Sequence, residues 1–126
     1  ASRGGKLVIY HGAADAAFSA LDTIKYWNAV NETADGQAAD FARLFIIPGM
    51  NHCQGGPATD DVDLLTPLMA WVEDDLPIER LEATVSNPDY FGGKNLSRPL
   101  CPYPLYAEYD GEGDPSSAES FTCVAN

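Results

Sequence analysis

The chain has 126 residues, 45% of them hydrophobic, and its 19 acidic and 7 basic residues give a formal charge of −12 at pH 7. This length and composition are typical of one globular domain with its own core. The negative charge disfavours contact with nucleic-acid phosphates, and no apolar run is long enough to cross a membrane. We therefore expect neither a nucleic acid nor a membrane as partner.

The first predicted elements are a strand and a helix. An apolar run predicts a strand over about 6–10, and a turn of small residues then leads to Asp15. Ser19 and Asp22 fit a capping box, in which each side chain satisfies a free backbone donor at the start of a helix. The apolar residues that recur at helical spacing, and that we expect to pack on the sheet, are Leu21, Ile24, Trp27 and Val30.

A second strand and helix follow. After a polar loop over 31–40, a strand is expected over about 43–47, and the turn after it leads to His52. A helix is expected over roughly 62–75, then a short strand over 81–85. The apolar stripe predicted for this second helix consists of Leu65, Leu68, Met69, Val72 and Leu76. The order strand, helix, strand, helix predicts an α/β fold with two parallel strands and flanking helices. Residues 85–126 are expected to form an irregular, loop-rich tail.

Asp15 and His52 are the candidate catalytic residues. Each follows a predicted strand, and the carboxyl ends of parallel strands meet at one edge of a sheet. In serine hydrolases with the triad order Ser, Asp, His, the acid orients the imidazole, which moves the proton of the nucleophile. No serine of this chain lies in a Gly-x-Ser-x-Gly elbow, so the nucleophile is expected in a preceding segment. Alternatively, Asp15 serves only as a turn residue and His52 caps the loop after it.

His11 precedes a glycine at the end of the first strand, and we expect it to be packed or bonded to the backbone. His11, Asp15, His52 and Cys53 together allow a metal site as an alternative interpretation. No C-x-x-C or H-E-x-x-H spacing supports that interpretation, so no metal is expected.

The three cysteines indicate an oxidising compartment. Cys101 and Cys123 lie in the tail, where a disulfide between them would stabilise a thin core by about 3 kcal/mol. Cys53 is then the odd cysteine, and we expect its disulfide partner in a segment absent from this chain. Disulfides persist outside the cytosol, so the protein is expected to be secreted or periplasmic.

Several segments resemble the tannase and feruloyl esterase family. Residues 6–15 are similar to the segment of that family that carries the catalytic acid, and residues 48–56 to the segment that carries the histidine. Further similarity lies at 71–73, Pro77, 98–104, 109–114 and 121–123. The resemblance covers nearly the whole of residues 1–126, but only the C-terminal portion of the family's α/β-hydrolase catalytic domain.

The resemblance implies a secreted serine hydrolase that cleaves esters of aromatic acids, such as gallates, ferulates and related terephthalates. It implies that Asp15 is the orienting acid and His52 the general base. It also implies that Cys53 bonds to a cysteine just before the nucleophilic serine. That serine, the oxyanion hole and a lid with a calcium site belong to the N-terminal part of the enzyme, which is the expected partner. No cofactor is expected in this chain, which we expect to be inactive alone.

Two other interpretations stay open. The missing nucleophile and the long tail also suit a non-catalytic binding or interaction module. A fragment of a generic serine hydrolase, of the dienelactone or peptidase type, would have the same Asp and His without a cysteine beside its nucleophile.

Overall fold

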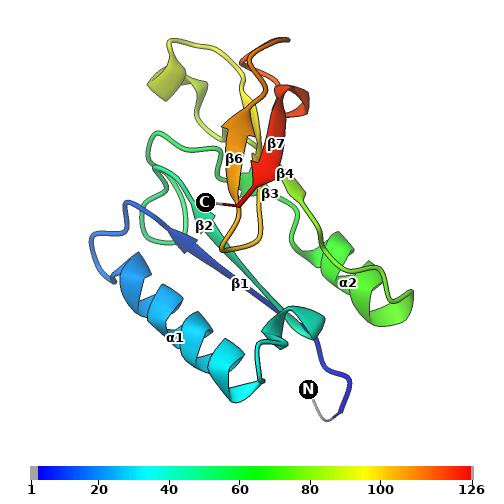
Figure 1. Ribbon diagram of the computed structural model, residues 1–126. Coiled ribbons are helices and arrows are strands. Elements are labelled where there is room, and N and C mark those ends of the chain that lie inside the picture. The colour runs from blue at the N-terminus through cyan, green and yellow to red at the C-terminus, as the bar shows by residue number, and fades with distance from the viewer. Residues whose placement is uncertain (1–2, 126) are drawn as a thin grey trace.

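The computed structural model of the chain describes residues 3–125. Figure 1 shows two helices on either side of a pair of strands, with the last third of the chain folded above them. The elements in chain order are β1 (Leu7–Gly12), α1 (Ala20–Thr33), η1 (Ala38–Asp40), β2 (Ala42–Ile47), β3 (Asp61–Val62), α2 (Leu65–Glu73), β4 (Leu81–Thr84), η2 (Pro88–Phe91), β5 (Ser97–Leu100), β6 (Tyr106–Tyr109), η3 (Ala118–Ser120) and β7 (Phe121–Val124).

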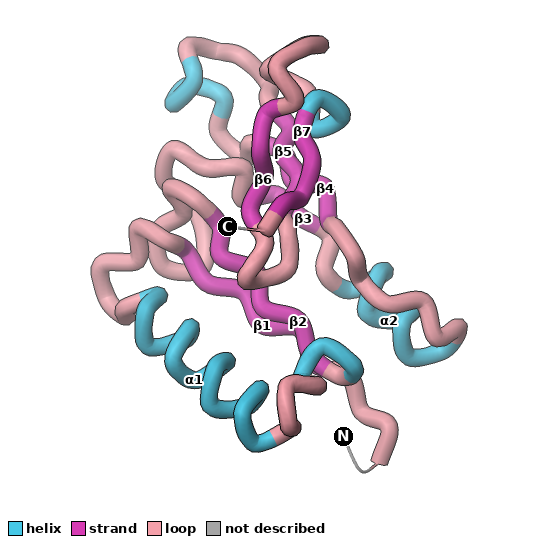
Figure 2. Tube along the Cα trace, in the orientation of Figure 1, coloured by secondary structure: helices cyan, strands magenta, loops and turns pink. Residues whose placement is uncertain are grey.

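Strands β1 and β2 form a parallel pair. Their register runs from Leu7 opposite Ala42 to Gly12 opposite Ile47, so both strands end together and their following loops leave from the same edge (Figure 2). Strand β1 extends two residues beyond the predicted range of 6–10, because His11 and Gly12 still pair with β2.

Side chains of β2 alternate between two cores, as the period of a strand requires. Leu44 lies in one cluster with Trp27 of α1, whereas Phe45 and Ile47 lie in another with Trp71 of α2. The two helices therefore cover opposite faces of the strand pair (Figure 1). This explains the nearly continuous apolar sequence of β2, since a strand buried on both faces has no polar side.

Helix α1 begins as predicted at Ser19, whose Oγ accepts a hydrogen bond from the backbone N–H of Leu21 at 3.2 Å. The other half of the predicted capping box is wrong, because the carboxylate of Asp22 pairs with Lys25 at 3.2 Å. Leu21 is 67% exposed and does not pack on the sheet, while Trp27 is buried there. The predicted loop over 31–40 was also too long, since α1 continues to Thr33 and η1 follows.

Helix α2 is shorter than the predicted range of 62–75. Val62 belongs to β3 and pairs with Ala83 of β4. Oδ1 of Asp63 accepts hydrogen bonds from the N–H groups of Leu65 and Thr66, both at 3.0 Å. Because these are free donors of a first helical turn, Asp63 fixes where the helix starts.

The apolar stripe predicted for this helix is largely wrong. Trp71 is its buried residue, and it packs with β2 and Leu81 of β4 in the same core. The exposed members of the predicted stripe are Leu65, Met69, Val72 and Leu76. The helix therefore presents apolar side chains away from the core of the described residues.

The tail is more regular than predicted. Strand β5 pairs antiparallel with β4, and β6 pairs antiparallel with β7. A disulfide joins Cys101 to Cys123, the pair that the sequence predicted, with their Cα atoms 5.6 Å apart. The strand predicted over 81–85 is confirmed as β4, whereas β5, β6 and β7 were not predicted, because their pairing partners lie outside a short window of sequence.

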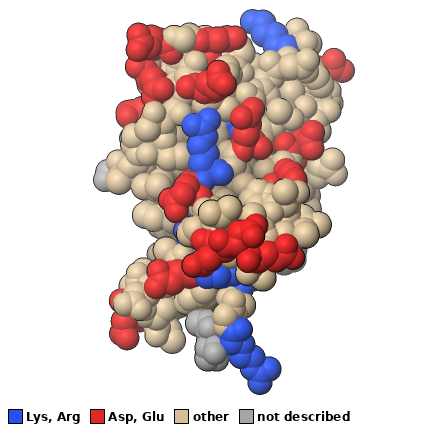
Figure 3. Space-filling model, turned by 90° about the vertical axis from the view of Figure 1, so that its right-hand side faces the viewer, with Lys and Arg blue, Asp and Glu red and all other residues tan. Residues whose placement is uncertain are grey.

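The surface carries many more acids than bases. Figure 3 shows acidic side chains spread over one face, with few basic side chains among them. In the part of the chain that the structure describes, neither helix has both the length and the apolarity needed to cross a bilayer.

Candidate active site

The loops after β1 and β2 meet at the carboxyl edge of the strand pair. The N–H of Ala13 donates to the carbonyl of Ile47 at 2.9 Å, and the N–H of Ala14 donates to that of Met50 at 3.0 Å. Gly12 makes this contact possible, because a Cβ there would overlap the carbonyl oxygens of Met50 and Asn51. The two loops thus extend the strand register into the site.

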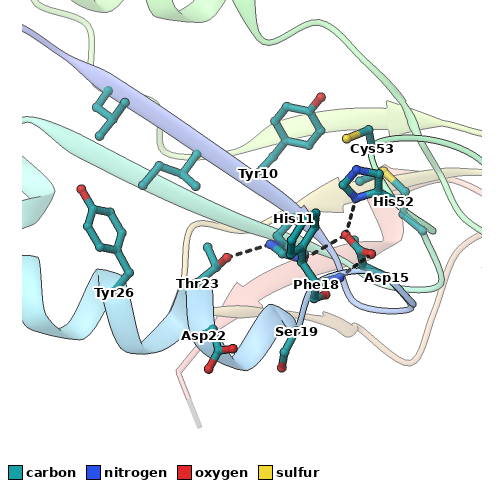
Figure 4. A pocket seen from close by; sticks show the side chains of 14 residues that line it. Tyr10, His11, Asp15, Phe18, Ser19, Asp22, Thr23, Tyr26, His52 and Cys53 are labelled. Carbon is teal, nitrogen blue, oxygen red and sulfur yellow. Dashed lines mark hydrogen bonds and ion pairs between the residues drawn. The ribbon is translucent and has the colours of Figure 1, made fainter.

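Asp15 and His52 lie in contact at this edge. Oδ2 of Asp15 is 2.8 Å from Nδ1 of His52, and Figure 4 marks this contact with a dashed line. Oδ1 of the same carboxylate accepts from the N–H groups of Ala17 at 2.7 Å and Phe18 at 3.0 Å. Asp15 therefore has both of the roles that its sequence allowed, as a turn residue through Oδ1 and as a partner of histidine through Oδ2.

The environment of Asp15 favours its charged form. The hydrogen bond from the His52 side chain lowers the pKa of Asp15 from its ordinary 3.8 to about 2. Burial acts in the opposite direction, and the backbone donors of Phe18 and Ala17 lower the pKa further. With its side chain only 3% exposed, Asp15 is a fixed anion beside the imidazole.

His52 has one nitrogen engaged and one free for chemistry. Its side chain is 53% exposed, and its ring lies against that of Phe18 with centroids 5.4 Å apart. Because Nδ1 faces a carboxylate, the neutral imidazole carries its proton on Nδ1 and leaves a lone pair on Nε2. This is the tautomer that a general base requires.

A groove of about 740 Å³ lies beside these residues and extends along β1. Since β2 is the only neighbour of β1 within the described sheet, the groove follows the open edge of that strand. Its walls are mostly apolar and aromatic, and the lining residues include Leu7, Ile9, Tyr10, Phe18, Tyr26 and Met50. Ser19 lines it too, but its Oγ caps α1, as the sequence indicated.

Cys53 lies next to His52, is exposed, and has no disulfide. It adopts a φ of 65°, in the left-handed region that non-glycine residues rarely occupy. Within residues 3–125, the structure places no three His, Cys, Asp or Glu side chains where together they could hold a metal ion.

His11 has the backbone bond that its sequence position predicted, together with two further contacts. Nε2 lies 3.2 Å from the carbonyl oxygen of Phe18 and 3.3 Å from Oδ2 of Asp15. Nδ1 lies 2.7 Å from Oγ1 of Thr23. The sequence did not indicate Phe18 and Thr23 at this site, because Phe18 reaches His52 through the turn around Asp15 and Thr23 reaches His11 only when α1 packs on β1.

Comparisons with known proteins identify the family. Residues 1–124 match the model of the family described as "Tannase and feruloyl esterase". The chain belongs to this family. The sequence resemblance is thereby confirmed, and it favours a family member over a generic serine hydrolase.

Similar proteins in this family include ester hydrolases. The chain is 53% identical over 123 residues to a mono(2-hydroxyethyl) terephthalate hydrolase of Piscinibacter sakaiensis, covering 98% of this chain and 20% of the relative. It is 38% identical over 126 residues to a probable feruloyl esterase of Arthroderma benhamiae, covering 96% and 23%. The crystal structure of feruloyl esterase B from Aspergillus oryzae superposes with a TM-score of 0.84 at 25% identity, covering 98% of this chain and 27% of that one. The chain thus spans about a fifth to a quarter of these proteins.

Proposed function

We propose that this chain is the C-terminal portion of the α/β-hydrolase catalytic domain of a serine carboxylic-ester hydrolase. In this proposal Asp15 is the orienting acid and His52 the general base and acid. The observation that carries it is the 2.8 Å contact between Oδ2 of Asp15 and Nδ1 of His52, which leaves Nε2 unprotonated.

The proposed mechanism uses His52 twice. Nε2 takes the proton of a serine hydroxyl as the serine oxygen bonds to the ester carbonyl carbon, and then gives it to the leaving alcohol as the acyl C–O bond breaks. Water then attacks the acyl-enzyme, with Nε2 again taking and returning the proton. Asp15 stabilises the imidazolium that forms in each step, which suits a carboxylate whose pKa is lowered to about 2.

The serine is proposed to come from the N-terminal part of the same enzyme. The open edge of β1 can accept another parallel strand, and a residue at the carboxyl end of that strand would lie beside Asp15 and His52. Cys53, exposed next to His52, is proposed to bond to a cysteine that precedes this serine. The disulfide would hold the base and the nucleophile together.

The proposed substrates are esters of aromatic acids, such as gallates, ferulates or related compounds. The apolar and aromatic lining of the groove suits a planar ring, and relatives named feruloyl esterase and terephthalate hydrolase act within this class. We propose a secreted or periplasmic location, in agreement with the disulfide of the tail. The oxyanion hole, a lid and its calcium ion are assigned to the N-terminal part, and no cofactor is assigned to this chain.

The test is the variant His52→Ala in the enzyme that contains both parts. Loss of a triad member should reduce kcat on an aromatic methyl ester by about 10⁴-fold or more. Lys25→Ala is the control, because Lys25 lies on α1 with its side chain 78% exposed. Retention of more than about one tenth of the turnover by His52→Ala would exclude His52 as the base.

The alternative of a non-catalytic interaction module has one observation in its favour, the exposed apolar side chains of α2. It predicts that joining the serine-bearing part to this chain creates no ester turnover. Measurable hydrolysis that depends on His52 would exclude it.

A further inference from the structure

His11 is a second imidazole at the candidate triad, and its three contacts define its proton. The two groups that face Nε2 are the carbonyl oxygen of Phe18 and Oδ2 of Asp15, at 3.2 and 3.3 Å. Both are acceptors only, so Nε2 must carry the hydrogen. The neutral ring then has a lone pair on Nδ1, which accepts from the hydroxyl of Thr23 at 2.7 Å.

In His52 the proton lies on the other ring nitrogen. Its Nδ1 faces the same Oδ2 of Asp15 at 2.8 Å, so its proton lies on Nδ1. Oδ2 of Asp15 therefore bonds to His52 and also lies 3.3 Å from Nε2 of His11, whose own hydrogen bond goes to the carbonyl of Phe18, and Figure 4 shows both rings beside this carboxylate. The side chain of His11 is 14% exposed and that of Asp15 only 3%, which leaves little room for water to replace either donor.

His11 also holds the loop that supports His52. Phe18 makes three contacts in this loop. Its N–H donates to Oδ1 of Asp15 at 3.0 Å. The carbonyl oxygen of Phe18 faces His11, and the ring of Phe18 packs against His52. The His11 ring thus connects strand β1 with Thr23 of helix α1 and with Asp15 and Phe18, each of which contacts His52.

From these contacts we infer that His11 is a positioning residue of the active site: as the Nε2–H tautomer, held by Thr23, it fixes Asp15 and Phe18 around His52. The effect of His11 on turnover rests on the proposed esterase function, whereas the tautomer of His11 can be measured in this chain without any enzyme activity. His11 touches no reacting atom in this assignment. His11 does line the groove, but its side chain is only 14% exposed, so its loss should change kcat more than KM.

The first measurement is the tautomer of each histidine in this chain, from long-range ¹H–¹⁵N correlation spectra at about pH 8.5, two units above the ordinary histidine pKa. We expect His52 protonated on Nδ1 and His11 on Nε2. In Thr23→Val, His11 should stay protonated on Nε2, because both acceptors of Nε2 remain, but the ¹⁵N shift of its Nδ1 should change because that nitrogen loses its hydrogen bond; the shifts of His52 should stay unchanged. Thr33→Val is the matched control, because its hydroxyl bonds to the carbonyl of Ala29 at the far end of α1. A native His11 protonated mainly on Nδ1 would overturn the assignment.

The second measurement compares substitutions of His11 in the enzyme that contains the nucleophile. The terminal NH₂ of Gln lies near the position of Nε2, whereas that of Asn lies near Nδ1. His11→Leu and His11→Asn should lower kcat about tenfold, the effect of leaving one buried hydrogen-bond acceptor without its donor, with KM nearly unchanged. His11→Gln should restore most of this loss.

Equal kcat for the Gln and Asn variants, or no loss in His11→Leu, would overturn the positioning role. If the unsubstituted enzyme hydrolysed no ester, the proposed function would fail, but the tautomer spectra would still decide the contacts of His11.

Discussion

Replacement of Asp15 by Asn is the substitution whose outcome the geometry defines most sharply. Oδ1 is held by two N–H donors, from Ala17 at 2.7 Å and Phe18 at 3.0 Å. These donors would retain the amide oxygen of Asn at the position of Oδ1, so that its NH₂ group replaces Oδ2. A donor would then face Nδ1 of His52 at the present 2.8 Å. His52 would turn to the tautomer with its proton on Nε2, which cannot accept one from a nucleophile.

We expect Asp15→Asn to lower kcat by about 10⁴-fold, as removal of the acid from a triad does through the wrong tautomer. The assay is steady-state hydrolysis of an aromatic ester by the enzyme that contains the serine. Long-range ¹H–¹⁵N spectra of this chain should show the proton of His52 moved from Nδ1 to Nε2. KM should change little, because the groove keeps its shape.

Asp75→Asn is the matched control. It removes the same charge from a carboxylate that is 92% exposed, contacts Lys6 at 3.9 Å, and is not among the residues that line the groove. This variant should keep kcat within about threefold of the parent value, since it affects no transition-state contact. If Asp15→Asn retained a tenth of the activity, or left His52 protonated on Nδ1, then Asp15 would not set the tautomer of His52 in the way that the contacts of Oδ1 predict.

Three further predictions concern stability and the site together. Replacing Cys101 and Cys123 by Ser should lower the free energy of unfolding by about 3 kcal/mol, from a sequence separation of 22 residues. Differential scanning calorimetry should show a lower Tm for this variant and no change for Cys53→Ser, which breaks no disulfide in this chain. Gly12→Ala should destabilise the chain by about 2 kcal/mol or more and disturb His52, because its Cβ overlaps carbonyl oxygens of the loop that carries the histidine; an unchanged Tm and an unchanged His52 spectrum would contradict this. The pKa of Asp15 is about 2 in the folded chain against an ordinary 3.8, so its contribution to stability is complete above pH 3.8 and is lost as the pH falls through about 2. Urea unfolding from pH 5 to pH 2 should show this decline, and Asp15→Asn should flatten it.

The sequence predicted the part of the fold that depends on local pattern. Continuous apolar runs marked β1 and β2 because a strand between two helices is buried on both sides. Ser19 marked the start of α1 because a hydroxyl can satisfy a free backbone donor there. The candidate acid and base followed from these strands, since loops after parallel strands meet at one edge.

The faces of the helices and the strands of the tail could not be predicted in this way. Trp71 rather than the leucines of α2 is buried, because residues of β2 and β4 that are distant in sequence define the core around it. Strands β5 and β6 have partners that a short window of sequence does not contain. Periodicity shows that a helix has an apolar side, but not which neighbour will cover it.

By itself, the sequence determined the two strands, the residue types at their ends and the family, because these depend on order along the chain. Only the tertiary structure decided how those residues meet. Arg43 lies within a predicted strand, yet its guanidinium is buried over the ring of Trp71 and its Nε donates to the carbonyl of Ile78 at 2.7 Å. His11 likewise meets Thr23 of α1 only because that helix packs against β1. Such contacts join segments separated by many residues, and their geometry is set by packing that no local pattern records.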